Sequence, residues 1–336
     1  MHVVILHNAV SPGDSIADQD VLLQVGVVSE ALTRLGHPWE TVPCTADLDP
    51  ALGEIERRRP DVVFNLVESL GGTDRFAHRA PALLDSMGVA YTGAPTMALF
   101  VSNRKVLAKE LLCHGGLPTP EWVRPKGAVL GEPGVLSSAS VFHASVTYVV
   151  KAFWEHASLD INDDSLVCAE DEGALQVRLE EAAARCGRPC FAERYIEGRE
   201  FNLSVLAGSD GPEVLPPAEI DFSAFPTDKP RIVSYRAKWE EGSFEFQNTP
   251  RRFDFPPEDR PLLDQLSQMA VACWRLFGLR GYARVDYRVD ATGQPWILEV
   301  NANPCLSPDG GFDAAAAQAS ISFDQTIARI LEDALR

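Results

Sequence analysis

The chain has 336 residues, of which 46% are hydrophobic, and its formal net charge at pH 7 is −18. This length predicts two or three domains with hydrophobic cores of their own, and the hydrophobic fraction is ordinary for a globular protein. The acidic balance argues against nucleic acid as a partner, because phosphate backbones need basic patches, and no apolar run is long enough to span a membrane.

The first ten residues, MHVVILHNAV, contain no basic region and no cleavage site. They therefore predict a β-strand rather than a signal peptide, and we expect a cytoplasmic protein. The seven cysteines show neither the pattern of a disulfide framework nor that of a zinc site. They are interpreted as buried free thiols in a reducing compartment.

Residues 1–98 alternate between strand and helix patterns and are predicted to form a first domain. Strands and helices are expected to alternate at 2–7, 20–35, 39–43, 50–58, 61–66 and 75–87. This βαβ rhythm indicates a small parallel sheet. The first strand is not followed by GxGxxG, so a dinucleotide-binding site is a weak interpretation.

Two further domains are predicted at 99–195 and 196–336, which makes the whole a mixed α/β fold. The central domain is expected to contain helices at 103–114 and 171–186, a loop at 125–138 and a strand at 147–151. Along the rest of the chain we expect strands at 191–196, 201–207 and 214–222, a hairpin at 282–301 and a helix at 323–335.

The predicted hairpin, within the segment YARVDYRVDATGQPWILEVNANP, carries the strongest chemical signal. Side chains two positions apart on a strand share a face. One face is therefore expected to gather four polar side chains: Arg284, Asp286, Glu299 and Asn301. The other face is expected to enter a core through Ala283, Val285, Tyr287, Trp296, Leu298 and Val300.

Two carboxylates and an amide on one face are oxygen ligands that suit Mg²⁺, which takes waters and substrate phosphates as its other ligands. Mn²⁺ is the alternative metal. An adjacent arginine stabilises charge that develops on a transferred or attacked oxygen. The competing interpretation is a solvated hairpin face whose charges align by chance.

Three lysines stand at positions typical of phosphate ligands. Lys105 begins a predicted helix, Lys151 ends an apolar strand, and Lys238 follows the strand-like stretch Ser234–Ala237. Each of them alone is more simply interpreted as a surface lysine. Their joint occurrence before one acidic hairpin favours the interpretation as phosphate ligands.

The segment AERYIEGREF, residues 192–201, predicts a strand, a turn and another strand. Such a hinge strand binds a base edge through its backbone, while a nearby carboxylate takes ribose hydroxyls. The alternative, favoured by the segment alone, is an edge strand with solvated acids.

With these lysines, this segment and the hairpin in the same order, the chain resembles the ATP-grasp superfamily and, within it, the D-alanine–D-alanine ligase family. The resemblance covers nearly all of the chain, is strongest over 277–331, and is clear in Tyr91–Gly93 and Lys105–Pro120. It implies three α/β domains, with ATP between the central and C-terminal ones.

Carried over position by position, the resemblance assigns most of the site. Lys105, Lys151 and Lys238 would hold ATP phosphates. Glu193, Arg194 and Ile196 would meet adenine, the last two through backbone, and Glu200 would meet ribose. Asp286, Glu299 and Asn301 would hold two Mg²⁺ ions, and Arg284 would stabilise the oxyanion. Arg284 and Lys238 are the catalytic candidates.

The positions that correspond to the family's amino-acid sites differ from its pattern. The acidic motif that holds the first substrate's amine is replaced by the stretch 15–20, and the His-Gly loop motif by Asn65–Glu68. A Ser and a Tyr of the family become Ala157 and Trp239. The candidate substrate residues are therefore Asp20, Glu68, Trp239, Cys305, Asp309, Gly310 and Gly311.

The implied function is an ATP-dependent carboxylate–amine ligase that works through an acyl phosphate on small amino-acid-like substrates. We expect a substrate other than, or in addition to, D-alanine, at least one of them with a cationic or polar group, because acids attract such groups. Three alternatives stay open: a D-alanine–D-alanine ligase of cell-wall synthesis, a non-catalytic nucleotide-binding sensor or scaffold, and solvated acids at 20, 68 and 309. A homodimer is also left open.

Overall fold

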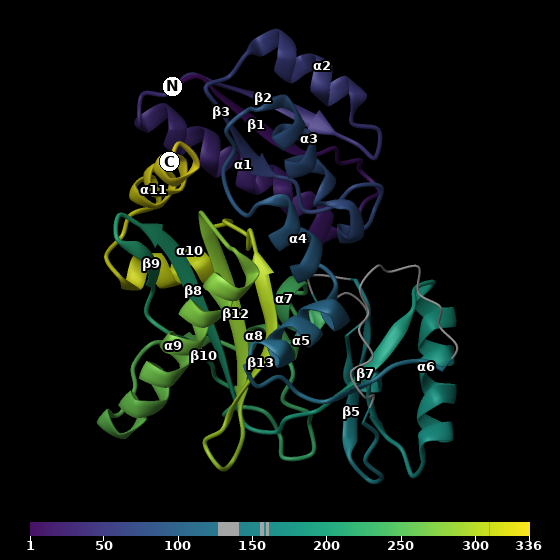
Figure 1. Cartoon of the computed structure of the whole chain (residues 1–336). Coiled ribbons are helices and arrows are strands. Elements are labelled where there is room, and N and C mark those ends of the chain that lie inside the picture. Colours follow the sequence, from purple (N-terminus) through teal and green to yellow (C-terminus); the bar gives the residue numbers. More distant parts are fainter. Residues whose placement is uncertain (127–140, 155–157, 159–160, 309) are drawn as a thin grey trace.

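The computed structural model describes residues 1–126, 141–154, 158, 161–308 and 310–336. Three sheets form its framework (Figure 1). The first is parallel, with strand order β2-β1-β3, and its strands are β1 (Val3–Asn8), β2 (Trp39–Cys44) and β3 (Val62–Leu66). Its helices are α1 (Ile16–Arg34), α2 (Asp49–Arg58) and α3 (Arg79–Met87), with a 3-10 turn at Asp74–Phe76.

Both faces of this parallel sheet are covered, as βαβ connections require. Val3 and Ile5 of β1 pack in one core with α1, whereas Val4 and Leu6 pack in another core with α2 and α3. The expected βαβ domain is thus present. Helix α1 begins earlier than predicted, because Ser15 caps it and its hydroxyl accepts the N–H of Asp18.

The second sheet is antiparallel, with strand order β4-β7-β5-β6. Its strands are β4 (Trp122–Val123), β5 (Thr147–Ala152), β6 (Leu166–Cys168) and β7 (Cys190–Arg194), preceded by a 3-10 turn at Asp163–Ser165. Helix α6 (Glu172–Cys186) covers one face through Leu175, Leu179 and Ala182. The predicted loop at 125–138 lies mostly outside the described residues.

The third sheet has the order β11-β10-β8-β12-β13, and β9 pairs with β8. Its strands are β8 (Arg199–Gly208), β9 (Gly211–Val214), β10 (Ala218–Ile220), β11 (Arg251–Arg252), β12 (Tyr282–Val289) and β13 (Pro295–Ala302). The single strand expected at 214–222 is interrupted, and the interruption contains Pro216 and Pro217, which lack the N–H that a ladder needs.

Alternation along these strands separates a core from a polar face. Phe201, Leu203, Val285 and Tyr287 enter one core with helix α9 (Arg260–Phe277), which follows a 3-10 turn at Pro257–Asp259 and was not predicted. Helices α4 (Thr96–Ser102) and α5 (Lys105–His114) join the same core. The predicted domain limits at 98 and 195 stay predictions, since this core spans the first of them.

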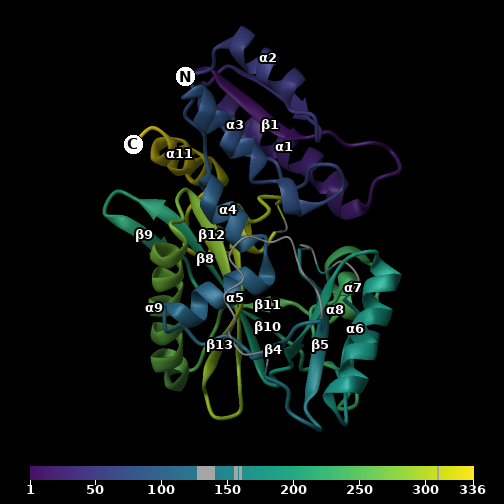
Figure 2. The same cartoon turned by 45° about the vertical axis from the view of Figure 1, so that its right-hand side comes forward.

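The last helices, α10 (Gly311–Gln318) and α11 (Phe323–Ala334), tie the C-terminal sheet to the parallel sheet. Ile327 and Ile330 share a core with Val3 and Ile5, and Arg34 of α1 forms a two-pronged ion pair with Asp324. In Figures 1 and 2 the N and C labels accordingly lie on the same side of the molecule.

Three local predictions are corrected. The stretch before Lys238 is helical: α7 (Tyr235–Trp239) starts at Ser234, whose hydroxyl caps the N–H of Ala237, and α8 (Phe244–Gln247) follows. The β12–β13 hairpin contains a register shift after Asp286, so Ile297, rather than Trp296 or Leu298, enters the core. All seven cysteines are free, but Cys113 and Cys168 are exposed rather than buried.

No helix within the described ranges combines the length and the apolar character that a membrane crossing requires.

Candidate active site

The β12–β13 hairpin places four predicted residues side by side on the polar face of the C-terminal sheet. Arg284 pairs with Asn301 across the hairpin, and Asp286 pairs with Glu299. Neighbouring strand β8 adds Asn202, opposite Asp286, and Glu200, opposite Arg288. Alternation on β8 could have identified Asn202, because it shares a face with Glu200.

The carboxylate of Asp286 accepts hydrogen bonds from three side chains on this face. Its Oδ1 accepts hydrogen bonds from Arg284 Nε and Asn202 Nδ2, each at 2.8 Å. Its Oδ2 accepts from Arg284 Nη2 and Asn301 Nδ2, each at 2.9 Å. Burial works to lower the pKa of Arg284, but the carboxylates of Asp286 and Glu299 outweigh it and raise that pKa. Arg284 is thus a fixed, permanently charged group.

Two lysines from distant segments approach the hairpin. Lys105, the first residue of α5, forms an ion pair with Glu299. Burial alone would raise the pKa of Glu299, but Lys105, Lys238 and Lys151 outweigh it and lower the pKa to about 2. Burial lowers the pKa of Lys238, and Arg284 lowers it further, against the opposing effect of Glu299. The carboxylate of Glu299 is therefore ionised at any physiological pH.

A second cluster lies on the central sheet, where one carboxylate holds two lysines. Glu193 Oε1 accepts from Lys151 Nζ at 2.6 Å, and Glu193 Oε2 accepts from Lys109 Nζ at 2.7 Å. Burial would raise the pKa of Glu193, but the two ammonium groups outweigh it and lower the pKa. Both oxygens that were predicted to face adenine are thus engaged by lysine.

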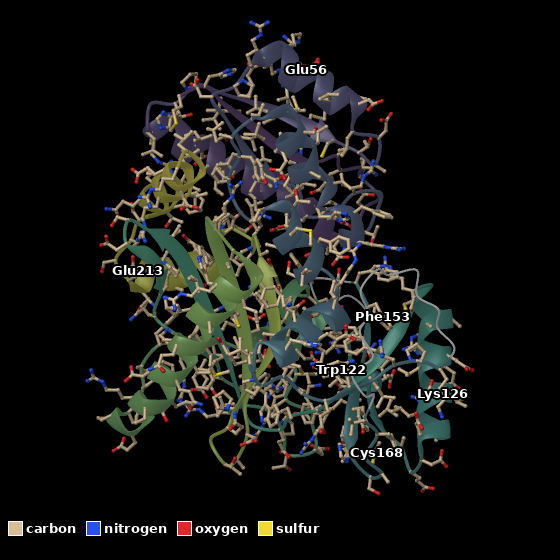
Figure 3. The ribbon with its side chains drawn as sticks, in the orientation of Figure 1. Glu56, Trp122, Lys126, Phe153, Cys168 and Glu213 are labelled. Atoms are coloured by element: carbon tan, nitrogen blue, oxygen red, sulfur yellow. The ribbon has the colours of Figure 1, made fainter. Side chains whose placement is uncertain are left out.

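Sequence reasoning missed Lys109, which is only 1% exposed. Its ammonium also donates to Thr119 Oγ1 at 2.7 Å and lies 5.3 Å from the ring centroid of Trp122. Trp122 and Phe153, both labelled in Figure 3, belong to an aromatic cluster that α5 shares with the central sheet. The sequence did contain a signal for Lys109: it lies one helical turn after Lys105, so the two side chains share a helix face.

The predicted adenine and ribose residues lie next to these clusters. Glu200 forms an ion pair with Arg288, with 3.2 Å between Oε2 and Nε. Burial raises the pKa of Glu200, although Arg288 opposes the rise. The backbone N–H of Arg194 donates to the carbonyl of Glu121 and so is not open to a base edge. Ile196 is buried.

Of the substrate candidates, the structure brings Asp20, Glu68 and Cys305 together. Gln24 Nε2 donates to Asp20 at 3.1 Å and to Glu68 at 2.8 Å, and Cys305 Sγ donates to Asp20 at 3.0 Å. Trp239 is the last residue of helix α7.

The glycines are less open than expected. The N–H of Gly310 donates to the carbonyl of Ser307 at 2.8 Å, so it is not free for a carboxylate, and Gly311 begins helix α10. Asp309 lies outside the described residues, as does Ala157.

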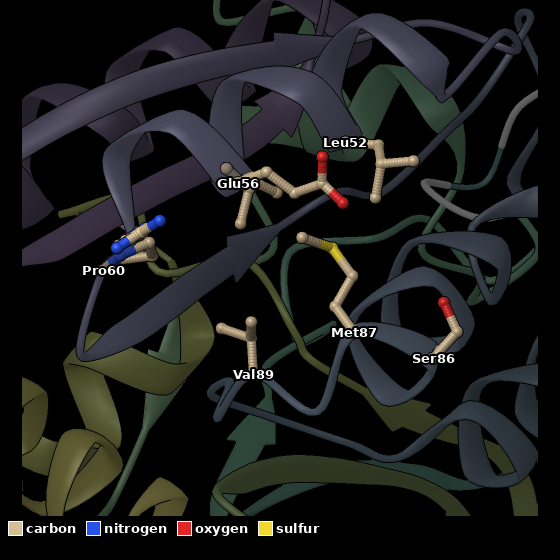
Figure 4. A pocket seen from close by; sticks show the side chains of 8 residues that line it. Leu52, Glu56, Pro60, Ser86, Met87 and Val89 are labelled. Atoms are coloured by element: carbon tan, nitrogen blue, oxygen red, sulfur yellow. The ribbon is translucent and has the colours of Figure 1, made fainter.

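A cavity of about 760 Å³ lies elsewhere, between α2 and the end of α3 (Figure 4). Its walls are Leu52, Ile55, Glu56, Arg59, Pro60, Ser86, Met87 and Val89, none of which was predicted to act in the site. The predicted site residues lie instead on the polar faces of the second and third sheets.

Comparison with known proteins agrees with this architecture. Residues 163–332 match the family model described as D-ala D-ala ligase C-terminus. A D-alanine–D-alanine ligase of Synechococcus sp. is 30% identical over 340 aligned residues, covering 100% of this chain and 94% of that protein. An uncharacterized protein of Sinorhizobium fredii is 30% identical, covering 92% and 86%.

A solved structure shows the same fold. The D-alanine–D-alanine ligase of Bacillus anthracis complexed with ATP superposes with a TM-score of 0.71 at 21% identity, covering 100% of this chain and 98% of that one.

Proposed function

Since the chain belongs to the D-alanine–D-alanine ligase family, we propose that it is an ATP-dependent ligase that joins the carboxylate of one amino-acid substrate to the amine of a second. The observation that carries this proposal is the convergence of Arg284, Asp286 and Glu299 with lysines of two other segments. Buried charges of both signs are costly to a fold, and their close grouping is typical of functional sites.

The charge balance of the site favours a polyanion. Lys105, Lys238 and Arg284 carry three positive charges against the two negative charges of Asp286 and Glu299. Lys109 and Lys151 carry two against the single charge of Glu193. The two clusters therefore keep a positive excess within a chain whose net charge is −18, which suits the phosphates of ATP.

The hairpin residues fit a Mg²⁺ site. No group of three or more His, Cys, Asp or Glu suited to a metal ion occurs in the described ranges. The hairpin instead offers two carboxylates and one amide, Asp286, Glu299 and Asn301, a set that suits a Mg²⁺ ion whose remaining ligands are water and phosphate. When bound there, Mg²⁺ neutralises charge on the phosphates.

The proposed reaction has two steps. A carboxylate oxygen of the first substrate attacks the γ-phosphorus of ATP, and the bond from that phosphorus to ADP breaks, which gives an acyl phosphate. The amine of the second substrate then attacks the acyl carbon, inorganic phosphate leaves, and the amine loses a proton. The lysines hold the phosphates, and Arg284, fixed by Asp286, stabilises the oxyanion of the second step.

The identity of the amino acids is a finer proposal. D-alanine is supported by the names of the relatives, whereas a different or additional substrate is supported by the acids at 20 and 68. A non-catalytic nucleotide-binding protein is the third possibility. ADP release with single amino acids and with pairs of them, followed by mass spectrometry of the product, separates the three: D-alanine dimer, another amide, or no amino-acid-dependent turnover.

A further inference from the structure

Two cysteine side chains are in contact beside the second sheet. Cys186 is the last residue of α6 and Cys190 is the first residue of β7, so the short connection 187–189 separates them. Their Sγ atoms lie 3.5 Å apart. Both thiols also donate to the carbonyl oxygen of Arg188, each at 3.5 Å. The two sulfur atoms therefore converge within one short connection.

The same connection contacts the segments that carry two of the lysines proposed to hold phosphates. The carbonyl of Pro189 accepts the N–H of Phe153 at 3.0 Å, and the carbonyl of Phe153 accepts the N–H of Lys105 at 2.9 Å. Phe191, at the start of β7, pairs with Lys151 of β5 across the sheet. A shift of this connection is thus transmitted to the backbone of both lysines.

We propose that Cys186 and Cys190 form a reversible disulfide when a peroxide is present, and that this bond weakens the binding of nucleotide. The second half of the inference rests on the proposed ligase function, whereas the first half does not. In a reducing compartment such a bond persists only while an oxidant is supplied, which is the behaviour of a switch and not of a permanent cross-link.

The oxidation proceeds in two steps. Cys186 is partly exposed, whereas Cys190 is only 3% exposed, so the peroxide meets Cys186 first. The thiolate of Cys186 attacks one peroxide oxygen, the O–O bond breaks, and a sulfenic acid and one water result. The thiolate of Cys190 then attacks the sulfenic sulfur, the S–S bond forms, and the leaving hydroxide takes up a proton to give a second water. Two thiols thereby lose two electrons and two protons to one peroxide.

The new bond requires a movement of the connection. A disulfide bond is about 2.05 Å long, so oxidation brings the sulfurs about 1.5 Å closer than their present 3.5 Å. The strand side is fixed, because Cys190 is paired within the sheet and its neighbour on β7 is fully buried. The connection adjusts at Gly187, whose φ of +69° is one that glycine adopts without strain. This movement lengthens the hydrogen bond from Phe153 to Pro189, which weakens the hold on Lys105.

The first experiment treats the full-length protein with hydrogen peroxide and maps its thiols by mass spectrometry after alkylation under denaturing conditions. Both cysteines fall in one tryptic peptide, residues 186–194, since the bond between Arg188 and Pro189 resists trypsin. We expect this peptide to escape alkylation and to be lighter by two hydrogen atoms, and dithiothreitol to restore both thiols. Sulfinic acid at Cys186, or two thiols that are still alkylated, overturns the inference.

The second experiment measures the effect on nucleotide by isothermal titration with a non-hydrolysable ATP analogue and Mg²⁺. The oxidised protein should bind the analogue about fivefold more weakly than the reduced protein, the size expected when one neutral hydrogen bond is lost. Equal affinity in the two states, or tighter binding after oxidation, overturns the switch.

Two variants test the assignment to these residues. Cys186→Ser and Cys190→Ser should each abolish both the disulfide and the loss of affinity on oxidation. Cys168→Ser is the matched control, because Cys168 is an exposed cysteine on β6 of the same sheet, and this variant should respond to peroxide as the wild type does. If Cys190→Ser does not fold, as judged by thermal melting, Cys186→Ser decides. A loss of affinity that persists in folded Cys186→Ser comes from oxidation elsewhere and overturns the inference.

Failure of the ligase function is distinguishable from failure of the switch. If the reduced protein binds no analogue, the proposed function and the second half of the inference are both contradicted, and the peptide map still decides the disulfide. If the reduced protein binds the analogue and releases ADP with amino acids, the ligase stands, and an unchanged affinity after oxidation contradicts the switch alone.

Discussion

Asp286 and Glu299 are direct partners across the β12–β13 hairpin, yet each carboxylate is held by a different cation, Asp286 by Arg284 and Glu299 by Lys105. The register shift begins immediately after this pair. Bulges of this kind often re-aim side chains next to active sites. The two acids therefore share one face of the sheet. On the other side of the register shift, the side chain of Ile297 enters the core.

Asp286→Asn and Glu299→Gln should each abolish turnover while the protein stays folded. Each change removes one negative oxygen where phosphate charge and Mg²⁺ would converge, and such electrostatic contributions are worth about 3–4 kcal/mol, or roughly 10²–10³-fold in rate. Steady-state ADP release and circular dichroism measure the two halves of the prediction. Glu181→Gln, at an exposed ion pair of α6, is the matched control. Near-normal rates in either site variant would contradict the assignment of Asp286 and Glu299 as Mg²⁺ ligands.

Lys151→Ala and Lys238→Ala should weaken nucleotide binding. A charge-assisted contact to phosphate contributes about 1.5–3 kcal/mol, which is roughly 10- to 150-fold in Kd. Isothermal titration with an ATP analogue measures the effect. Lys126→Ala is the control, because Lys126 is a surface lysine whose side chain is 66% exposed. Unchanged affinity and turnover in both site variants would show that these lysines do not hold the nucleotide phosphates.

Lys109→Met should destabilise the fold more than any change of a surface lysine. The substitution leaves Thr119 unpaired and leaves Glu193 with one partner in a buried setting. Breaking a buried pair from one side costs about 3–5 kcal/mol. Urea denaturation should show this loss, whereas Lys126→Met should change the free energy of unfolding by less than about 1 kcal/mol. A loss as small as that of the surface control would contradict the structural role of Lys109.

The sequence predicted the parallel sheet, the hairpin and its polar face, because alternation and βαβ order are local patterns. The helical state of Lys238 was not predicted, although Ser234 caps the helix through the N–H of Ala237. The bulge at Leu298 is a property of strand pairing, and one strand alone does not reveal it.

The sequence predicted which charged residues form the site, but it did not predict which of them form ion pairs with one another. Nothing local to Glu193 indicates that lysines from α5 and β5 would both reach it. Gln24 was missed because an isolated amide carries no signal of its own in sequence, whereas Asn202 could have been found from its alternation with Glu200 on β8. The assembly of Asp20 with Cys305 joins residues from opposite ends of the chain, and only the packing of the C-terminal segment on α1 reveals it.

Glu68 predicts a specific pH dependence of stability. Burial raises the pKa of Glu68 to about 7, with Asp20 and Asp18 adding to the rise against the hydrogen bond from Gln24. The unfolded carboxyl titrates at about 4.3, so the folded state binds more protons between roughly pH 4.5 and 7. Its contribution to stability is complete below this window and is lost as the pH rises through it, by up to about 1.4 kcal/mol per pH unit.

Glu68→Gln should remove this dependence. The difference in urea midpoint between pH 5 and pH 8 should be smaller in the variant than in the wild type, and the variant should be relatively more stable at pH 8. All other titrating groups are common to the two proteins and cancel in the comparison. An identical pH slope in both would show that Glu68 titrates normally.

The central claim is that the chain forms an amide at the expense of ATP. The most direct test incubates the protein with ATP, Mg²⁺ and amino acids, singly and in pairs, and follows ADP by a coupled assay and products by mass spectrometry. The account predicts ADP release that requires an amino acid, equals the amount of an amide whose mass is that of the two substrates less one water, and disappears in Asp286→Asn. ATP binding without amino-acid-dependent ADP release across the full panel of amino acids would contradict it.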